Sequence, residues 1–299
     1  MTQVPFKQVD VFTNIPYRGN PVAVVLDAQG LTSKQMQEIA NWTNLSETTF
    51  VLPPKHAGAD YLVRIFTPRS ELPFAGHPTL GTAHALLEAG KITPKNGRLV
   101  QECEAGLIEL RINSTSDASP VIEFNLPKPS FVALSGDEVS ELESVLGATV
   151  QRHNWPKKVN VGPVWTIVPM DSAEAVLALQ PDFARMAQFD RINQSIGTVV
   201  YGAYAKGSPA AIEVRAFAPG VGVNEDPVCG SGNGAVAAFI REAGQVSNFG
   251  SSFVSTQGVF VGRAGRIFVS FDGEDRIRVG GQSVTCINGS IALSLGVNS

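Results

Sequence analysis

The stretch FAGHPTLGTAHALLEAG, residues 74–90, decides the fold because the stretch VCGSGNGAVAAFIREAG, residues 228–244, repeats its pattern. In both, a glycine-bearing loop leads into an alanine-rich segment that ends in Glu-Ala-Gly. Apolar segments with few charges predict helices that are buried on most sides, and a glycine directly after the last turn is a common helix end. We therefore predict buried helices over Thr79–Ala89 and near Asn233–Ala243.

The repeat extends to either side of these helices. VRIFTP at Val63–Pro68 returns as VRAFAP at Val214–Pro219, and GNPVAVVLD at Gly19–Asp27 returns more faintly as GPVWTIVPMD at Gly162–Asp171. The first pair is offset by 151 residues and the helical stretches by 154. Matches in the same order at a nearly constant offset indicate a duplicated domain, whereas a solenoid needs at least three shorter units.

The segments around each helix are mostly short and β-rich. Predicted strands include Val9–Phe12, Val22–Leu26, Thr48–Leu52, Tyr61–Phe66, Arg98–Val100, Leu107–Ile112, Val159–Val168, Thr198–Tyr204 and Ile212–Phe217, with an amphipathic helix over Leu31–Asn41. We predict an α+β fold of two duplicated domains, each a mostly antiparallel, β-barrel-like sheet wrapped around a central buried helix. The predicted N-terminal half is residues 1–128 plus the segment 286–299, and the C-terminal half is 129–285, with a linker near Pro127–Ser130.

Composition excludes several classes of function. The net charge is −4 without a basic run, which argues against a nucleic-acid partner. No stretch approaches the ~20 apolar residues of a membrane span, and the N-terminus lacks the apolar core of a signal peptide. The three cysteines, Cys103, Cys229 and Cys286, form no CxxC pair, and the four histidines are scattered. We therefore expect a cytoplasmic protein without a disulfide framework, a metal site or a membrane partner.

The two repeated loops are the places where chemistry is expected. PFAGHPT (Pro73–Thr79) and EDPVCGSGNG (Glu225–Gly234) both lead into a helix N-terminus, where exposed N–H groups and the helix dipole suit an anion such as a carboxylate. Either loop alone is an ordinary capped turn. Two copies at equivalent positions favour a shared site in a cleft between the halves.

Polar residues gather at these loops. His77 lies in the first loop, and Asp226, Cys229 and Ser231 lie in the second. Glu47, in NLSETTF, stands at the start of an apolar strand, where an exposed salt-bridge partner is ordinary. A carboxylate partly buried there has a raised pKa and acts as a base near neutral pH.

Four motifs together resemble the phenazine-biosynthesis PhzF-like isomerase family, which shares the diaminopimelate-epimerase fold. They are RGNPVAVV, NLSETTFV, FTPRSELPFAGHPTLGTAHAL and NEDPVCGSGNGA, and the resemblance runs from Val9 to about Gly289. It implies two domains with the active site in the cleft, a homodimer, and neither metal nor organic cofactor. It also implies an isomerase that relocates a proton on a small carboxylate-bearing substrate similar to trans-2,3-dihydro-3-hydroxyanthranilate.

The resemblance also implies roles for individual residues. Glu47 of SET falls on the family's general acid/base, and His77 of AGHP and Asp226 of EDP fall on residues that hold the substrate and assist the proton's relocation. A single acid/base residue suffices because the two proton transfers occur in sequence. The predicted substrate-binding residues are Gly76, Gly230, Ser231 and Asn20.

Cys229 leaves alternatives open. Epimerases of this fold use two thiols, one in each glycine loop, but the position equivalent to Cys229 in the first loop is Ala75. Cys229 is then a small buried residue, or a thiol activated by the helix N-terminus. The alternatives to the isomerase are an amino-acid epimerase or dehydratase that uses Cys229, and a non-catalytic small-molecule binder.

Overall fold

The computed structural model describes residues 2–113, 119–273 and 276–293, and it divides into two compact units. Unit 1 is Met1–Asn125 with Gly280–Ser299, and unit 2 is Leu126–Val279. Both units combine strands and helices, so the predicted α+β class is confirmed. Within the described ranges, every helix is too short or too polar to cross a bilayer.

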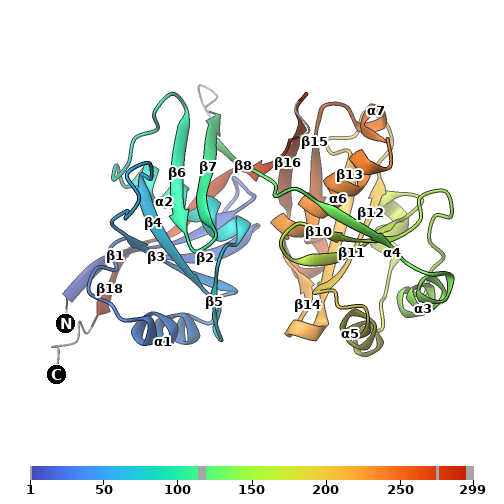
Figure 1. Ribbon diagram of the computed structural model, residues 1–299, viewed down its shortest axis with the longest axis horizontal. Coiled ribbons are helices and arrows are strands. Elements are labelled where there is room, and N and C mark those ends of the chain that lie inside the picture. Colours follow the sequence, from blue (N-terminus) through green and yellow to red (C-terminus); the bar gives the residue numbers. More distant parts are fainter. Residues whose placement is uncertain (1, 114–118, 274–275, 294–299) are drawn as a thin grey trace. The chain divides into compact units, whose positions relative to one another are not determined.

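Unit 1 is a mixed sheet around one buried helix (Figure 1). Its strands are β1 (Thr2–Val11), β2 (Asn20–Val25), β3 (Glu47–Leu52), β4 (Tyr61–Phe66), β5 (Glu71–Leu72), β6 (Arg98–Cys103), β7 (Gly106–Asn113), β8 (Val121–Asn125) and β18 (Ser283–Leu293). β2 pairs with β3 and β4 with β6 in parallel, while β1–β2, β1–β18, β3–β4, β6–β7 and β7–β8 are antiparallel. Parallel neighbours need a crossover connection, and helices α1 (Ser33–Thr43) and α2 (Gly76–Glu88) lie in those two crossovers.

Unit 2 repeats this order of pairings. Its strands are β9 (Ser130–Ala133), β10 (Lys157–Asn160), β11 (Val164–Pro169), β12 (Gly197–Ala203), β13 (Ile212–Ala218), β14 (Val223–Asp226), β15 (Ser252–Gln257) and β16 (Gly265–Phe271), with β17 (Ile277–Gly281) running across the boundary with unit 1. β11–β12 and β13–β15 are parallel, and β10–β11, β12–β13 and β15–β16 are antiparallel. The buried helix is α6 (Gly230–Glu242), which is followed by the short α7 (Val246–Phe249).

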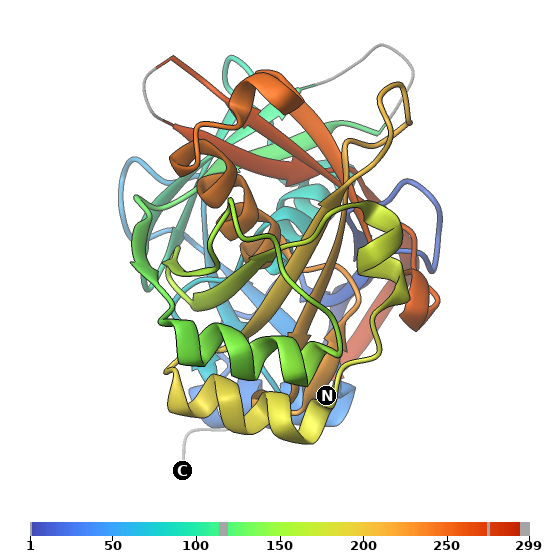
Figure 2. The same ribbon diagram turned by 90° about the vertical axis from the view of Figure 1, so that its right-hand side faces the viewer.

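Four α-helices in the described part of unit 2 were not predicted from the sequence. They are α3 (Gly136–Leu146), α4 (Ala173–Ala178), α5 (Phe183–Ile192) and the short α7. α3 and α5 lie side by side on the outside of unit 2 (Figure 2). They pack their apolar faces into a core with Phe217 and Val200. The expected strand Val159–Val168 is also two strands, because the backbone turns at Gly162, whose φ is +107°.

Both units hold a bidentate arginine–glutamate pair at the same place. Arg64 of β4 contacts Glu71 of β5, with Nη2 2.6 Å from Oε2, and Arg215 of β13 contacts Glu225 of β14 at 2.9 Å. In each case the guanidinium also lies over the ring of the phenylalanine two residues further along the strand. The pair in unit 2 is more deeply buried, with 5% and 6% of the side chains exposed against 25% and 30% in unit 1.

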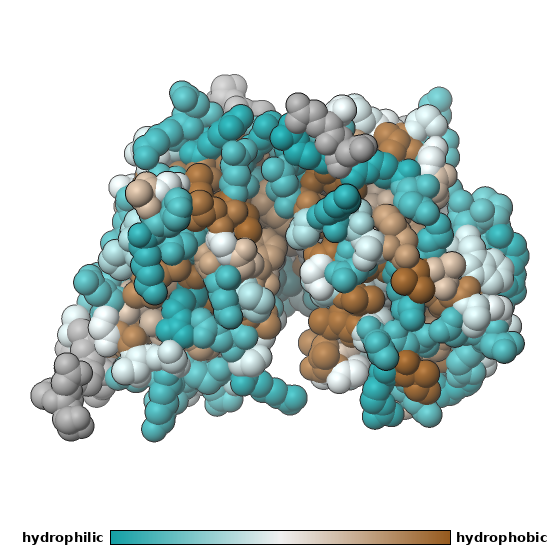
Figure 3. All heavy atoms as spheres, in the orientation of Figure 1, coloured by the Kyte–Doolittle hydropathy of each residue, from teal (hydrophilic) through white to brown (hydrophobic). Residues whose placement is uncertain are grey.

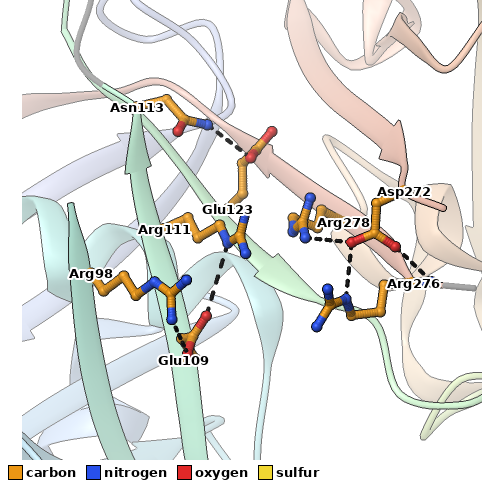
Figure 4. A network of polar contacts seen from close by, with 8 residues as sticks. All are labelled: Arg98, Glu109, Arg111, Asn113, Glu123, Asp272, Arg276 and Arg278. Atoms are coloured by element: carbon orange, nitrogen blue, oxygen red, sulfur yellow. Dashed lines mark hydrogen bonds and ion pairs between the residues drawn. The ribbon is translucent and has the colours of Figure 1, made fainter. Parts of the chain in front are cut away.

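Other charged clusters lie at the strands' surfaces (Figure 4). In unit 1, Glu109 of β7 contacts Arg98 at 3.4 Å and Arg111 at 3.9 Å. In unit 2, Asp272 accepts hydrogen bonds from Arg276 at 2.9 Å and Arg278 at 2.5 Å. Exposed pairs such as those of Glu109 contribute little to stability.

The buried helices pack closely because glycines face the sheets. Ten of the thirteen residues are buried in each of α2 and α6. In α2, a Cβ on Gly81 would lie 2.4 Å from Val22 Cγ1 and 2.9 Å from Val11 Cγ2. In α6, a Cβ on Gly234 would lie 2.5 Å from Leu126 Cδ1. Larger residues at these positions would push the helix away from its sheet.

We expect Gly81→Ala to destabilise unit 1 by about 1–3 kcal/mol, because overpacking outweighs the better helix propensity of alanine. Gly136→Ala is the matched control, since no atom lies within 4 Å of a Cβ built on Gly136 in the first turn of α3. Its stability should change by less than about 1 kcal/mol, in the stabilising direction. Urea unfolding of both variants measures the difference, and equal midpoints would contradict the packing argument.

Candidate active site

Glu47 and His77 come together in unit 1. Glu47 begins β3, and His77 lies in the first turn of α2. His77 Nε2 is 3.2 Å from Glu47 Oε2, and only 9% and 16% of the two side chains are exposed. The contact has the distance of an ion pair but not the angles of a hydrogen bond. A carboxyl and an imidazole that lie together in a buried site can exchange a proton with a bound molecule.

Burial changes the acidity of Glu47. Desolvation raises the pKa of its carboxyl from 4.5 to about 7, and a hydrogen bond with Ser46 opposes part of this rise. A carboxyl with a pKa near 7 is present in both protonation states at neutral pH. It can therefore take a proton in one step and return it in the next.

Three more predicted or neighbouring residues surround this pair. Asn20 begins β2 and is buried, and its Oδ1 lies 3.4 Å from Ser46 Oγ. Asn20 thus reaches Glu47 through the residue beside it. Gly76 is the first residue of α2, and a Cβ there would lie 2.9 Å from Phe124 Cζ. The close approach of that ring explains a glycine at this position.

The second glycine loop forms the corresponding place in unit 2. Gly230 and Ser231 begin α6, and Cys229 is its N-cap, whose Sγ accepts the N–H of Gly232 at 3.2 Å. Cys229 is 6% exposed. Ser231 Oγ accepts a hydrogen bond from Trp165 Nε1 at 3.0 Å and lies 3.6 Å from Cys229 Sγ. The thiol thus takes the place of the oxygen that usually caps a helix.

Asp226 ends β14 and shapes the same loop. Its Oδ1 accepts the N–H of Val228 at 3.0 Å, and its carbonyl accepts Gln257 Nε2 at 2.9 Å. Gln257 Oε1 accepts the N–H of Cys229 at 3.1 Å and Nδ2 of Asn233 at 2.8 Å. One glutamine side chain therefore holds the loop at both ends.

Sequence reasoning missed Ser46, Trp165 and Gln257. Ser46 precedes Glu47 in a motif that was recognised, so its position was visible. Trp165 and Gln257 lie on β11 and β15, far along the chain from the loop that they contact. Local sequence carried no signal for either contact.

Apolar side chains border the Asp226 loop. Val221, Val223 and the segment Val259–Val261 are exposed, and hydrophobic residues gather over β14 in Figure 3. A Cβ on Gly258 would lie 2.3 Å from the carbonyl oxygen of Pro227, so this segment touches the loop itself. An apolar surface beside a polar loop suits a ligand with a ring and a charged group.

A hollow of about 740 Å³ in unit 2 is a different feature. It is lined by residues that include Gln151, Asn154, Tyr201 and Phe249, and by none of the predicted site residues. Two of its polar side chains are engaged with the protein, since Gln151 Nε2 donates to Met170 O and Asn154 Nδ2 donates to Gln151 Oε1. We do not assign it to the active site.

Another buried carboxyl, Asp190, has the contacts of a structural residue. Burial raises its pKa to about 6, and its Oδ1 accepts hydrogen bonds from Thr198 at 2.8 Å and Ser195 at 3.2 Å. These contacts tie the end of α5 to β12. No group of three His, Cys, Asp or Glu side chains in the described part of the chain is arranged to hold a metal ion.

We expect Glu47→Gln to stabilise the protein at pH 8 by about 1–3 kcal/mol, because one pKa unit is worth about 1.36 kcal/mol. The folded state holds its proton up to pH 7 and the unfolded chain loses it near 4.5, so wild-type stability falls between these values. The gain should therefore be absent at pH 4 and complete above pH 7. Urea unfolding at several pH values measures it, and a gain that does not vary with pH would contradict the burial of a titrating carboxyl.

Comparisons with known proteins identify the family of the chain. The family described as phenazine biosynthesis-like protein matches residues 9–289. "Antisense-enhancing sequence 1" of Schizosaccharomyces pombe is 45% identical over 97% of this chain and 99% of its own. "Trans-2,3-dihydro-3-hydroxyanthranilate isomerase" of Pseudomonas fluorescens is 37% identical over 95% and 98%. A Bacillus anthracis protein of the PhzF family has a TM-score of 0.85 at 27% identity, covering 98% of this chain and all of that one. The predicted enzyme class, isomerase, is confirmed, and the chain belongs to the phenazine biosynthesis-like, or PhzF, family.

Proposed function

We propose that this protein relocates a proton on a small, carboxylate-bearing substrate similar to trans-2,3-dihydro-3-hydroxyanthranilate, without a metal or organic cofactor. The observation that carries the proposal is the buried carboxyl of Glu47, with a pKa of about 7 and His77 at 3.2 Å. The relative from Pseudomonas fluorescens, named for this isomerisation, supports the substrate class.

In the proposed reaction Glu47 acts twice. As a carboxylate it removes a proton from a carbon next to a conjugated system; the C–H electron pair enters that system and a double bond shifts. Glu47, now protonated, delivers the proton to another carbon, and the carboxylate is regenerated. No atom is gained or lost, so no co-reactant is needed. His77 and Asp226 hold the polar groups of the substrate and assist the transfer.

We infer that the two units are copies of one ancestral unit and that their loops serve one substrate in a cleft. The support is the equal order of strand pairings, the arginine–glutamate pair in each unit and the helix that follows each glycine loop. Asn20, Gly76, Gly230 and Ser231 would then bind the substrate. If both loops act on one molecule, Glu47→Gln and Asp226→Asn should each impair turnover, although they lie in different units.

A thiol-based epimerase or dehydratase is the second candidate, because Cys229 accepts an N–H at the start of a buried helix. A thiol at a helix N-terminus is a common arrangement for a reactive cysteine. The position where a two-thiol epimerase has its second cysteine is occupied by Ala75, whose side chain makes no capping hydrogen bond to α2. A non-catalytic binder is the remaining alternative.

Proton exchange in deuterium oxide separates these candidates. Wild type, Glu47→Gln and Cys229→Ser are incubated with trans-2,3-dihydro-3-hydroxyanthranilate and a panel of small amino and hydroxy acids, and deuterium uptake is followed by NMR. Turnover that is lost in Glu47→Gln and kept in Cys229→Ser supports the proposal. The reverse result favours the thiol, and exchange with no compound favours a binder.

The proposal includes a cytoplasmic homodimer, as the family resemblance implies. Light scattering during size-exclusion chromatography should then give about twice the chain mass of 31.7 kDa. A mass equal to that of one chain would contradict the dimer without affecting the proposed chemistry.

A further inference from the structure

Ser231 and His77 occupy equivalent positions in the two units. Each follows the first glycine of a thirteen-residue buried helix, at an offset of 154 residues. His77 contacts Glu47, whereas Ser231 contacts Trp165. In unit 2, the partner of the loop residue is therefore a tryptophan, whereas in unit 1 it is the acid/base residue Glu47.

Strand register identifies the residue of unit 2 that corresponds to Glu47. Phe66 and Phe217 are equivalent by the VRIFTP and VRAFAP repeat, and they pair with Thr48 and Thr198. The residues before these threonines are therefore equivalent, which places Gly197 of unit 2 where unit 1 has a glutamate. Glu47 pairs with Val22 on the neighbouring parallel strand, and Gly197 pairs in the same way with Trp165.

The indole of Trp165 fills the place that a side chain at residue 197 would take. A Cβ on Gly197 would lie 2.7 Å from Trp165 Cζ3 and 2.1 Å from the carbonyl oxygen of Phe217. The glycine therefore leaves room for the ring, and Trp165 is 3% exposed. From this position Nε1 reaches Ser231 Oγ at 3.0 Å.

This contact sets the direction of the Ser231 hydroxyl. An indole N–H can only donate, so Ser231 Oγ accepts from Trp165 and its own proton points to another acceptor. Among the described residues, the acceptor recorded near it is Cys229 Sγ at 3.6 Å, a weak acceptor that already receives the N–H of Gly232. A carboxylate oxygen is a much stronger acceptor and would displace the sulfur.

We propose that Trp165 is a positioning residue that holds Ser231 as a hydrogen-bond donor to the carboxylate of the substrate. The inference rests on the proposed function for the identity of that carboxylate. The two units then have different roles, since unit 1 has the Glu47 carboxyl, beside His77, which moves the proton, and unit 2 has the hydrogen-bonded Trp165 and Ser231, which hold the anionic group.

The hydrogen bond is tested by NMR of the indole N–H groups, independently of activity. The chain has three tryptophans, so Trp42→Phe, Trp155→Phe and Trp165→Phe assign the three signals. The Trp165 signal should move in Ser231→Ala. In wild type, adding anthranilate should also move the Trp165 signal. Methyl anthranilate, which lacks the negative charge, should not move it. An unchanged signal in Ser231→Ala, or no binding of anthranilate to wild type at millimolar concentration, would overturn the inference.

Kinetics test the positioning role. Trp165→Phe should raise KM for trans-2,3-dihydro-3-hydroxyanthranilate about tenfold and change kcat less than about threefold. It should add nothing in the Ser231→Ala background, because the hydroxyl that it orients is gone. Trp155→Phe is the matched control: it loses an indole hydrogen bond to Leu134 O within unit 2 and should keep the wild-type KM.

The two failures can be told apart. An effect of Trp165→Phe that is equally large without the Ser231 hydroxyl would overturn the positioning role. Absence of turnover in wild type, together with the expected indole shifts and anthranilate binding, would sink the proposed reaction and leave the assignment of Trp165 and Ser231 in place.

Discussion

Glu47→Gln should lower kcat for isomerisation by about 10²–10⁴-fold, the range that a positioned acid/base residue contributes. Glutamine keeps the shape of the side chain but can neither take nor return a proton. The buried place beside His77 is kept, so the substrate should bind with a KM within about threefold of wild type. Stopped-flow or NMR assays of turnover measure the loss. A kcat within tenfold of wild type would show that another group carries the proton.

The pH profile of wild type gives a second check on the same residue. Since the carboxylate is the form that removes a proton, kcat/KM should rise with pH and reach half of its maximum near the pKa of Glu47, about 7. An ordinary exposed glutamate would place this midpoint near 4.5. Ser46→Ala removes the hydrogen bond that holds the pKa down, so the midpoint should move to higher pH in that variant.

Glu225→Gln should lower the free energy of unfolding of unit 2 by about 3–5 kcal/mol, because it leaves the buried charge of Arg215 without the carboxylate of Glu225. Arg215 donates to the carbonyls of Leu179 at 2.8 Å and Val176 at 3.3 Å, and its guanidinium lies 4.1 Å from the centre of the Phe260 ring. These contacts keep it from turning toward water. Urea unfolding followed by tryptophan fluorescence reports on unit 2, which holds Trp155 and Trp165.

Glu71→Gln in unit 1 is the matched control. It removes the same bidentate partner from Arg64, but these side chains are 25% and 30% exposed, so water can solvate the remaining charge. The expected cost is about 1 kcal/mol or less. Equal losses in the two variants would show that burial does not set the difference.

Much of the fold could be predicted from local pattern. β4 is found where the VRIF run predicted it, over Tyr61–Phe66, and both alanine-rich helices exist. They begin three residues earlier than the apolar pattern indicated, at Gly76 and Gly230, because the glycine-bearing loop itself forms the first turn. Helix α3 escaped prediction because it precedes the repeated segments of the second half. Helix α5 lies in the crossover between β11 and β12, as α1 does between β2 and β3, but the sequences of these two crossovers show no recognisable match.

The sequence by itself determined which residues are candidates and how the chain is organised. The repeated loops drew attention to His77, Asp226 and Ser231, and the resemblance of the four motifs to the family implied the role of Glu47. Only the tertiary structure decided how these groups behave. The pKa of Glu47 depends on the burial that β3 and α2 create together, and the proton of Ser231 depends on Trp165, 66 residues away in the chain. Burial and long-range hydrogen bonds arise from packing between segments that are distant in the chain, so they cannot be predicted from the local sequence around either residue.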